Sequence, residues 1–137
     1  MWHLGTGRIQ YDPPRGGMKR KTKWWCVINV DREITRYYRW WIERQYHIKG
    51  LNQPAWDAHI SIIRGERPHD DLIDLWKAYE SEEIKFWYKH EPRVGHNKNE
   101  GAYWFVEVDC PQGIEMRKEF NLRYDWPLHL TVGRTYF

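Results

Sequence analysis

The amino-acid sequence predicts one domain in which strands and helices are mixed. With 137 residues, the chain is long enough to enclose a hydrophobic core but too short for two independent domains of ordinary size. Stretches rich in β-branched and aromatic residues alternate with stretches of helical spacing, and no apolar run approaches the length of a membrane span. We therefore expect a single domain over residues 1–137, with a single functional site.

The first half of the chain is predicted to contain two strands separated by a helix. Residues 1–23 are expected to form an arm or loop, because glycines and prolines interrupt every periodic pattern there. A strand is expected over 24–30, and Asp31 can then cap a helix that reaches about His47. After a break, the segment 58–64 alternates and branches like a second strand.

The second half is predicted to repeat this pattern after a short helix and an additional strand. In order, we expect a short helix over 68–79, a strand over 84–90, a polar loop over 92–101, a strand over 102–109, a helix over 111–122 and a strand over 128–133. Each half therefore has a strand, a helix and then a strand that carries His-x-Ser/Thr. This order indicates a weak internal duplication.

Two copies of a His-hydrophobic-Ser/Thr motif lie on predicted strands. The first copy is His59-Ile60-Ser61-Ile62 and the second is His129-Leu130-Thr131-Val132, and an arginine and a glycine follow each copy closely. Residues two apart on a strand point to the same face, so each histidine shares a face with its hydroxyl residue. Two such strands side by side would gather both imidazoles and both hydroxyls around a volume about the size of a phosphate.

The paired motifs suit cleavage of a phosphodiester. A neutral imidazole can take the proton of a 2′-OH or a water while a protonated one gives a proton to the leaving oxygen, and an unperturbed pKa of about 6.5 suits both roles. Ser61 and Thr131 can donate hydrogen bonds to the non-bridging oxygens. A single histidine on a strand is more often structural, and the second copy reverses that expectation. The other five histidines have no partner at comparable spacing, and no side chains have the spacing of metal ligands.

At these residues the sequence resembles the 2H phosphoesterase superfamily, whose signature is two His-hydrophobic-Ser/Thr-hydrophobic motifs on strands. The resemblance implies an α+β fold with bilobal antiparallel sheets flanked by helices and an active-site cleft between two pseudo-symmetric halves. It also implies cofactor-free cleavage of phosphodiesters or 2′,3′-cyclic phosphates by His59 and His129. Within that superfamily, the segments His59-Ile-Ser-Ile-Ile-Arg-Gly-Glu, Trp76-Lys-x-Tyr-Glu and Leu128-His-Leu-Thr-Val-Gly look like the phage anti-CBASS proteins. Those small enzymes degrade the cyclic di- and trinucleotide signals of bacterial antiviral defence.

The resemblance to the anti-CBASS proteins implies a cyclic oligonucleotide substrate, cut at a 3′-5′ linkage without a metal. The bases of such a ligand need aromatic side chains on which to stack. The candidate substrate-binding residues are Tyr11, Trp25, Trp87 and Trp104, together with Arg64 beside the first motif. Ordinary core packing is the competing explanation for each of these aromatic residues.

Two alternative functions stay open from the sequence alone. A 2H esterase acting on RNA ends or 2′,3′-cyclic phosphates would use the same histidines, and a non-catalytic nucleotide-binding sponge would use the same basic and aromatic surface. The net charge of +3 favours phosphate ligands without marking a binder of double-stranded DNA. The start of the chain does not resemble a secretory signal, and Cys26 and Cys110 lie in strand-like stretches, so we expect a cytoplasmic protein with reduced cysteines and no membrane partner. If a phage encodes it, that cytoplasm is the host's.

Overall fold

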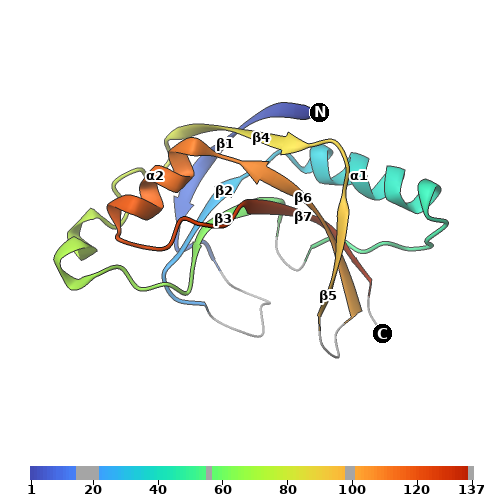
Figure 1. The fold of residues 1–137 in the computed structure, drawn as a ribbon. Helices are drawn as coiled ribbons and strands as arrows, with labels where there is room; N and C mark the ends of the chain where they lie inside the picture. Colours follow the sequence, from blue (N-terminus) through green and yellow to red (C-terminus); the bar gives the residue numbers. More distant parts are fainter. Residues whose placement is uncertain (15–21, 55–56, 98–100, 136–137) are drawn as a thin grey trace.

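Seven strands form one antiparallel sheet in the computed structural model, which describes residues 1–14, 22–54, 57–97 and 101–135 (Figure 1). In chain order, the elements of these residues are β1 (Trp2–Tyr11), β2 (Trp25–Asn29), α1 (Arg32–Gln45), β3 (His59–Arg64), the 3₁₀ helix η1 (Asp70–Leu75), β4 (Glu83–Lys89), β5 (Arg93–Asn97), β6 (Gly101–Asp109), α2 (Pro111–Glu119) and β7 (Leu128–Thr135). The strands lie in the order β4-β1-β2-β3-β7-β6-β5.

The sheet closes on itself, which shows that the bilobal α+β fold expected from the family resemblance is wrong. β4 pairs with β6 as well as with β1, with Trp87 opposite Asp109 and Tyr88 opposite Val108. Six strands therefore form a closed antiparallel barrel, and β5 extends the sheet outside β6. β1 is the strand that links β2 to β4 and completes the ring. Since the sequence assigned this segment to a loop, the closure was not foreseen.

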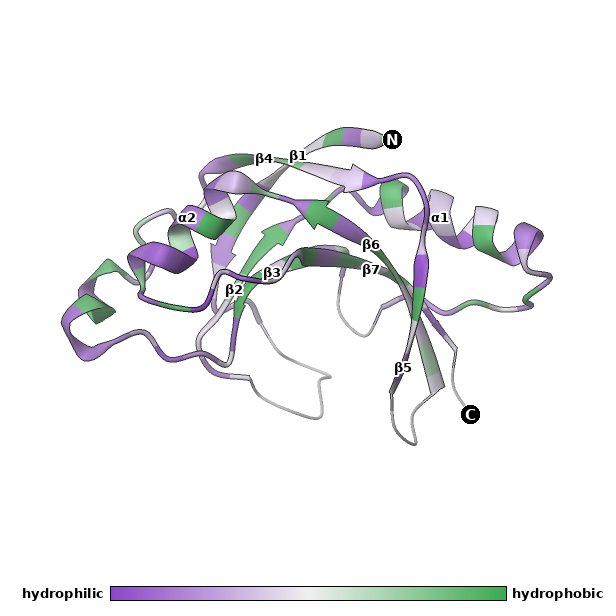
Figure 2. Cartoon of the chain, in the orientation of Figure 1, coloured by the Kyte–Doolittle hydropathy of each residue, from purple (hydrophilic) through white to green (hydrophobic). Residues whose placement is uncertain are grey.

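One hydrophobic core runs through the closed sheet. Its buried residues come from all six strands of the ring and from both α-helices. Figure 2 shows hydrophobic residues concentrated along β2, β3, β6 and β7, whereas the helices mix hydrophobic and hydrophilic residues. On α1, Tyr38 and Ile42 face this core one turn apart, as the predicted stripe requires, and the Asp31 side chain accepts from the Glu33 backbone N–H at 2.9 Å as the helix cap. Burial of one large apolar side chain contributes about 1.5–3 kcal/mol.

Each α-helix joins two neighbouring strands but packs against a strand of the other half of the chain. α1 connects β2 to β3 and packs on β7, whereas α2 connects β6 to β7 and packs on β3 and β4. The helices lie toward opposite ends of the arched sheet (Figure 1). The two halves are therefore interlocked.

β1 and β5 lie where the sequence predicted an arm over 1–23 and a polar loop over 92–101. Each contains a glycine directly opposite an aromatic residue, with Gly5 opposite Phe86 and Gly95 opposite Tyr103. A Cβ on Gly5 would lie 2.7 Å from the Phe86 ring, and one on Gly95 would overlap the Tyr103 ring. These glycines meet a packing requirement and do not break their strands. Residues 15–21 of the predicted arm lie outside the described residues.

The other predicted elements are present within a few residues of their expected bounds, with one exception. The short helix predicted over 68–79 is reduced to η1, which ends at Leu75, and turns follow it. None of the residues of η1 is buried. A short segment with no fully buried residue has too little packing to extend a helix.

Candidate active site

The two His-x-Ser/Thr motifs lie side by side on β3 and β7. These strands are antiparallel neighbours with Ile60 opposite Leu130, and this register sets each histidine opposite the hydroxyl residue of the other motif. Because Ile60 and Leu130 are fully buried in the core, the four motif side chains share the other face of the sheet. Opposite residues on such a face have Cβ atoms about 5 Å apart, and diagonal neighbours are about 7–8 Å apart. His59 and His129 are therefore diagonal neighbours.

A backbone carbonyl fixes the His59 ring. Nδ1 of His59 lies 2.6 Å from the carbonyl oxygen of Asp57, which can only accept, so Nδ1 carries the hydrogen of this bond. Arg32 in turn binds the Asp57 carboxylate, with Nη2 at 2.8 Å from Oδ2. Burial lowers the pKa of His59, and the charges of Arg64 and His129 lower it further, while the carbonyl bond opposes them. Because Nδ1 carries the hydrogen, Nε2 is the nitrogen with the basic lone pair in the neutral ring.

The His129 ring is held differently. The Phe105 ring on β6 meets it nearly edge-on, with centroids 5.6 Å apart, and the described residues place no hydrogen-bond partner on its nitrogens. Although the residue is exposed, the surrounding groups desolvate its ring and lower its pKa, and the charge of Arg64 lowers it again. The two imidazoles therefore respond to the same cation, and His59 also responds to His129.

Trp25 on β2 orients Ser61. Its Nε1–H donates to Oγ of Ser61 at 3.0 Å, and its ring meets the His59 ring edge-on with centroids 5.5 Å apart. Trp25 is only 1% exposed, so no ring face is open for a nucleobase to stack on. Because the tryptophan donates this bond, the Ser61 hydroxyl keeps its own proton to donate to a ligand.

A β-bulge lies at the last residue of each motif and turns an arginine toward the histidines. Ile62 has no opposite residue in the pairing of β3 with β2, and Val132 has none in the pairing of β7 with β6. The extra residue reverses the alternation of side chains, so Arg64 and Arg134, each five residues after its histidine, share the histidine face. The Arg64 guanidinium lies 5.8 Å from the centroid of the Trp25 ring. The same face thus gathers imidazoles, hydroxyls and guanidinium groups from both motifs.

The structure does not bring the other three aromatic candidates to the histidines. Tyr11 and Trp104 are 3% and 8% exposed and belong to the core. Trp87 lies on the outward face of β4, which is separated from β7 by β6. The sequence did not single out Phe105 or Asp57. Alternation alone leaves open which face of the strand over 102–109 meets the motif, and the register with β7 selects Phe105.

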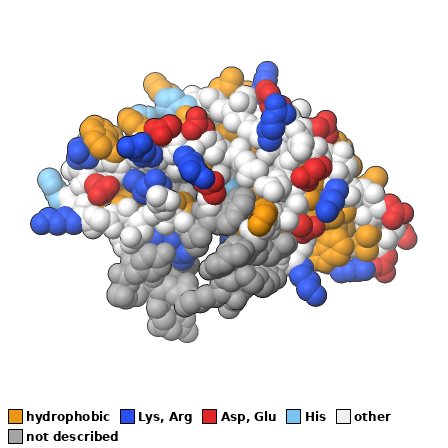
Figure 3. All heavy atoms as spheres, turned by 180° about the vertical axis from the view of Figure 1, so that it is seen from behind, with side chains coloured by type: hydrophobic (Ala, Val, Ile, Leu, Met, Phe, Trp, Pro, Cys, Tyr) orange, Lys and Arg blue, Asp and Glu red, His pale blue; other side chains and the backbone are white. Residues whose placement is uncertain are grey.

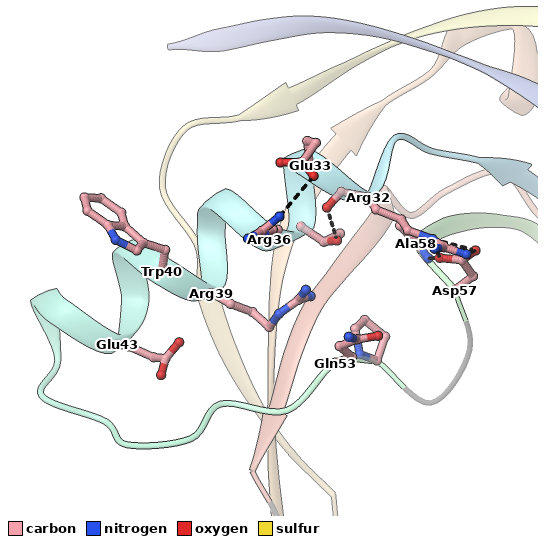
Figure 4. A pocket seen from close by; sticks show the side chains of 11 residues that line it. Arg32, Glu33, Arg36, Arg39, Trp40, Glu43, Gln53, Asp57 and Ala58 are labelled. Atoms are coloured by element: carbon pink, nitrogen blue, oxygen red, sulfur yellow. Dashed lines mark hydrogen bonds and ion pairs between the residues drawn. The ribbon is translucent and has the colours of Figure 1, made fainter.

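A pocket of about 600 Å³ lies between α1 and the segment before β3, and none of the four motif side chains lines it (Figure 4). Three arginines and three carboxylates line it, namely Arg32, Arg36, Arg39, Glu33, Glu43 and Asp57. Arg32 binds Asp57 at 2.8 Å and Arg36 binds Glu33 at 3.5 Å. The formal charges of the lining cancel, so the pocket offers a phosphate less attraction than the histidine face does.

Charge and ligand chemistry elsewhere in the described chain add little to this site. Seen from behind, Lys and Arg side chains are interspersed with Asp and Glu and do not form a continuous basic band on that face (Figure 3). Among the described residues, no three His, Cys, Asp or Glu side chains form a group that could hold a metal ion. None of the helices described has both the length and the apolar character needed to cross a membrane.

Comparisons with protein-family models, curated proteins and solved structures give no match.

Proposed function

We propose that this protein is a metal-independent phosphodiesterase that cleaves 3′-5′ linked cyclic di- and trinucleotides in the cytoplasm, as a phage enzyme acting against CBASS defence. The observation that carries the chemistry is the group of two imidazoles and two hydroxyls on β3 and β7, with Arg64 beside them. The substrate comes from the resemblance of the two motif segments to the anti-CBASS proteins. Two buried cysteines without a disulfide agree with a reducing compartment.

In the proposed reaction, a 2′-OH of the substrate attacks the adjacent phosphorus and the 5′-oxygen leaves, so that a 2′,3′-cyclic phosphate forms. One neutral imidazole accepts the proton of the 2′-OH, and the other, protonated, gives a proton to the leaving oxygen. For His59 the transferring atom is Nε2, because Nδ1 is bound to the Asp57 carbonyl. Ser61, Thr131 and Arg64 would bind the non-bridging oxygens, where negative charge gathers in the transition state.

Incubation with cyclic dinucleotides and trinucleotides in the presence of EDTA tests this proposal. We expect cleavage to persist in EDTA and to fall by about 10²- to 10⁴-fold in His59→Gln and in His129→Gln, the range that general acid or base catalysis supplies. His69→Gln is the matched control, since His69 is exposed, belongs to neither motif strand and makes no capping hydrogen bond with its side chain at the start of η1. Loss of activity in EDTA, or full activity in either motif variant, would contradict the proposal.

A panel of substrates separates the proposal from its two alternatives. Turnover of RNA ends or 2′,3′-cyclic phosphates well above that of cyclic dinucleotides would keep the chemistry and replace the substrate. Tight binding followed by full recovery of the intact cyclic nucleotide would replace the enzyme with a sponge. In the sponge, each histidine would affect affinity only through its direct contacts.

A further inference from the structure

Arginines of the two α-helices donate equivalent hydrogen bonds to the bulges at the ends of the two motifs. Nη1 of Arg117 on α2 donates to the carbonyl oxygen of Ile62 at 2.8 Å, and Nη1 of Arg39 on α1 donates to that of Val132 at 2.9 Å. Ile62 and Val132 occupy the same position in the two motifs, three residues after the histidine. Each helix therefore reaches the motif strand of the other half of the chain.

These hydrogen bonds compensate for the irregular backbone of the bulges. The extra residue of a bulge interrupts the ladder and leaves backbone groups without a strand partner. Ile62 and Val132 are 1% and 0% exposed, so water cannot readily take that place. A buried carbonyl without a partner costs about 1–3 kcal/mol, and the arginine N–H removes this cost. The helix arginines therefore favour the bulged register over a regular one.

The bulged register matters because it decides where two other arginines point. In a regular strand, a residue five positions after a histidine lies on the opposite face, which here is the core. The bulges reverse this, so Arg64 and Arg134 share the face of the histidines. For Arg64 the consequence is already visible, since its charge acts on both imidazoles.

The surroundings of Arg39 are built for this contact. A Cβ on Gly133 would lie 2.7 Å from Leu51 and 3.2 Å from Cγ of Arg39, so glycine is needed for the arginine stem to lie against the β7 backbone. Among the described residues, Arg39 has no carboxylate within ion-pair distance, whereas Arg117 binds Glu66 with both terminal nitrogens, at 2.6 and 2.7 Å. Figure 4 shows Arg39 extending from α1 toward the segment that carries Gln53. The bond to Val132 is the one hydrogen bond of the Arg39 side chain in the described chain.

We propose that Arg39 and Arg117 are positioning residues, which brace the two bulges and thereby keep Arg64 and Arg134 on the face of the histidines. The kinetic consequence rests on the proposed phosphodiesterase function. The backbone consequence is independent of it.

Arg39→Met is the sharpest test, because it keeps the apolar stem and removes the donor without breaking an ion pair. We expect kcat to fall about tenfold to a hundredfold, the effect of a small misplacement of groups that bind the transition state. Arg39→Lys should restore part of kcat, since an ammonium group can also donate to the carbonyl. The matched control is Arg36→Met, one turn earlier on the same helix, where the side chain binds only the exposed Glu33 among the residues that the structure describes.

Nuclear magnetic resonance supplies a readout that does not need activity. In Arg39→Met, the carbonyl ¹³C signal of Val132 should move upfield and the amides of Thr131 to Arg134 should exchange faster, while Arg36→Met leaves both unchanged. An unchanged Val132 signal would overturn the claim that Arg39 stabilises the bulge, whatever the activity. A shifted signal with unchanged kcat would overturn the positioning role. An inactive wild-type protein would refute the proposed function alone. The Val132 signal would still show whether Arg39 stabilises the bulge.

Discussion

Arg64 is the charged residue that lowers the pKa of both histidines. Desolvation lowers the pKa of each imidazole most, and the positive charge of Arg64 is the next largest effect that lowers it. Both rings are therefore held toward their neutral form by these surroundings. A bound phosphate carries the opposite charge and favours protonation of a ring. In the proposed enzyme, binding of the anionic substrate would load the proton that the leaving oxygen needs.

The pH dependence of kcat/KM should report this effect of Arg64 on the two pKa values. The proposed reaction needs one ring protonated and one neutral, so its optimum lies between the two apparent pKa values of the histidine pair. Both values are lowered from 6.5, which places the optimum below that pH. Arg64→Gln removes a positive charge and raises both pKa values, so the optimum should move to higher pH even where the rate is reduced. Arg67→Gln is the control, because Arg67 binds Asp70 at the surface. An unmoved optimum in Arg64→Gln would refute the effect of Arg64 on the two pKa values.

At the residue scale, the sequence identified the four motif residues that the structure brings together, because two copies of one strand motif carry their own alternation. It could not identify residues whose place depends on register. Trp25 was expected at the ligand and instead donates to Ser61. Asp57 acts through its backbone carbonyl, for which no side-chain pattern exists.

At the scale of elements, the helix over α1 could be predicted because its cap and apolar stripe are local features. β1 and β5 could not, because the reason for their glycines lies on another strand, in the rings of Phe86 and Tyr103. The bulges are hidden for a similar reason. Strict alternation in His59–Arg64 would have placed Arg64 on the core face, and only the pairing with β2 reveals the extra residue.

Arg117 should be the residue of α2 on which the end of β3 most depends. Its side chain is 2% exposed, and it binds the Glu66 carboxylate as well as the carbonyls of Ile62 and Arg123. Arg117→Met leaves these acceptors without their donor and should lower the free energy of unfolding by about 3 kcal/mol, the low end for a broken buried pair because Glu66 is partly exposed. Lys118→Met removes an exposed pair with Glu115 and should change it by less than about 0.5 kcal/mol. Urea denaturation measures both, and equal losses would refute the assignment.

At the scale of the molecule, closure of the ring joins what the sequence suggested were two halves. Residues of both halves contribute to one core cluster, and each α-helix packs on a strand of the other half. Neither half could unfold without exposing the buried surface of the other. A bilobal protein would instead allow its lobes to lose structure one at a time.

Cooperative unfolding is the property that distinguishes the closed ring from two lobes. Ile42 on α1 and Met116 on α2 are 0% and 4% exposed and belong to the same core, although their helices lie toward opposite ends of the sheet. Ile42→Ala and Met116→Ala should each lower the free energy of unfolding by about 2–4 kcal/mol in a single transition, with tryptophan fluorescence and far-ultraviolet circular dichroism coinciding. Leu75→Ala, at an exposed position of η1, should leave the midpoint nearly unchanged. If either core variant splits the transition, or shifts one probe without the other, the halves unfold separately and the ring does not bind them into one cooperative unit.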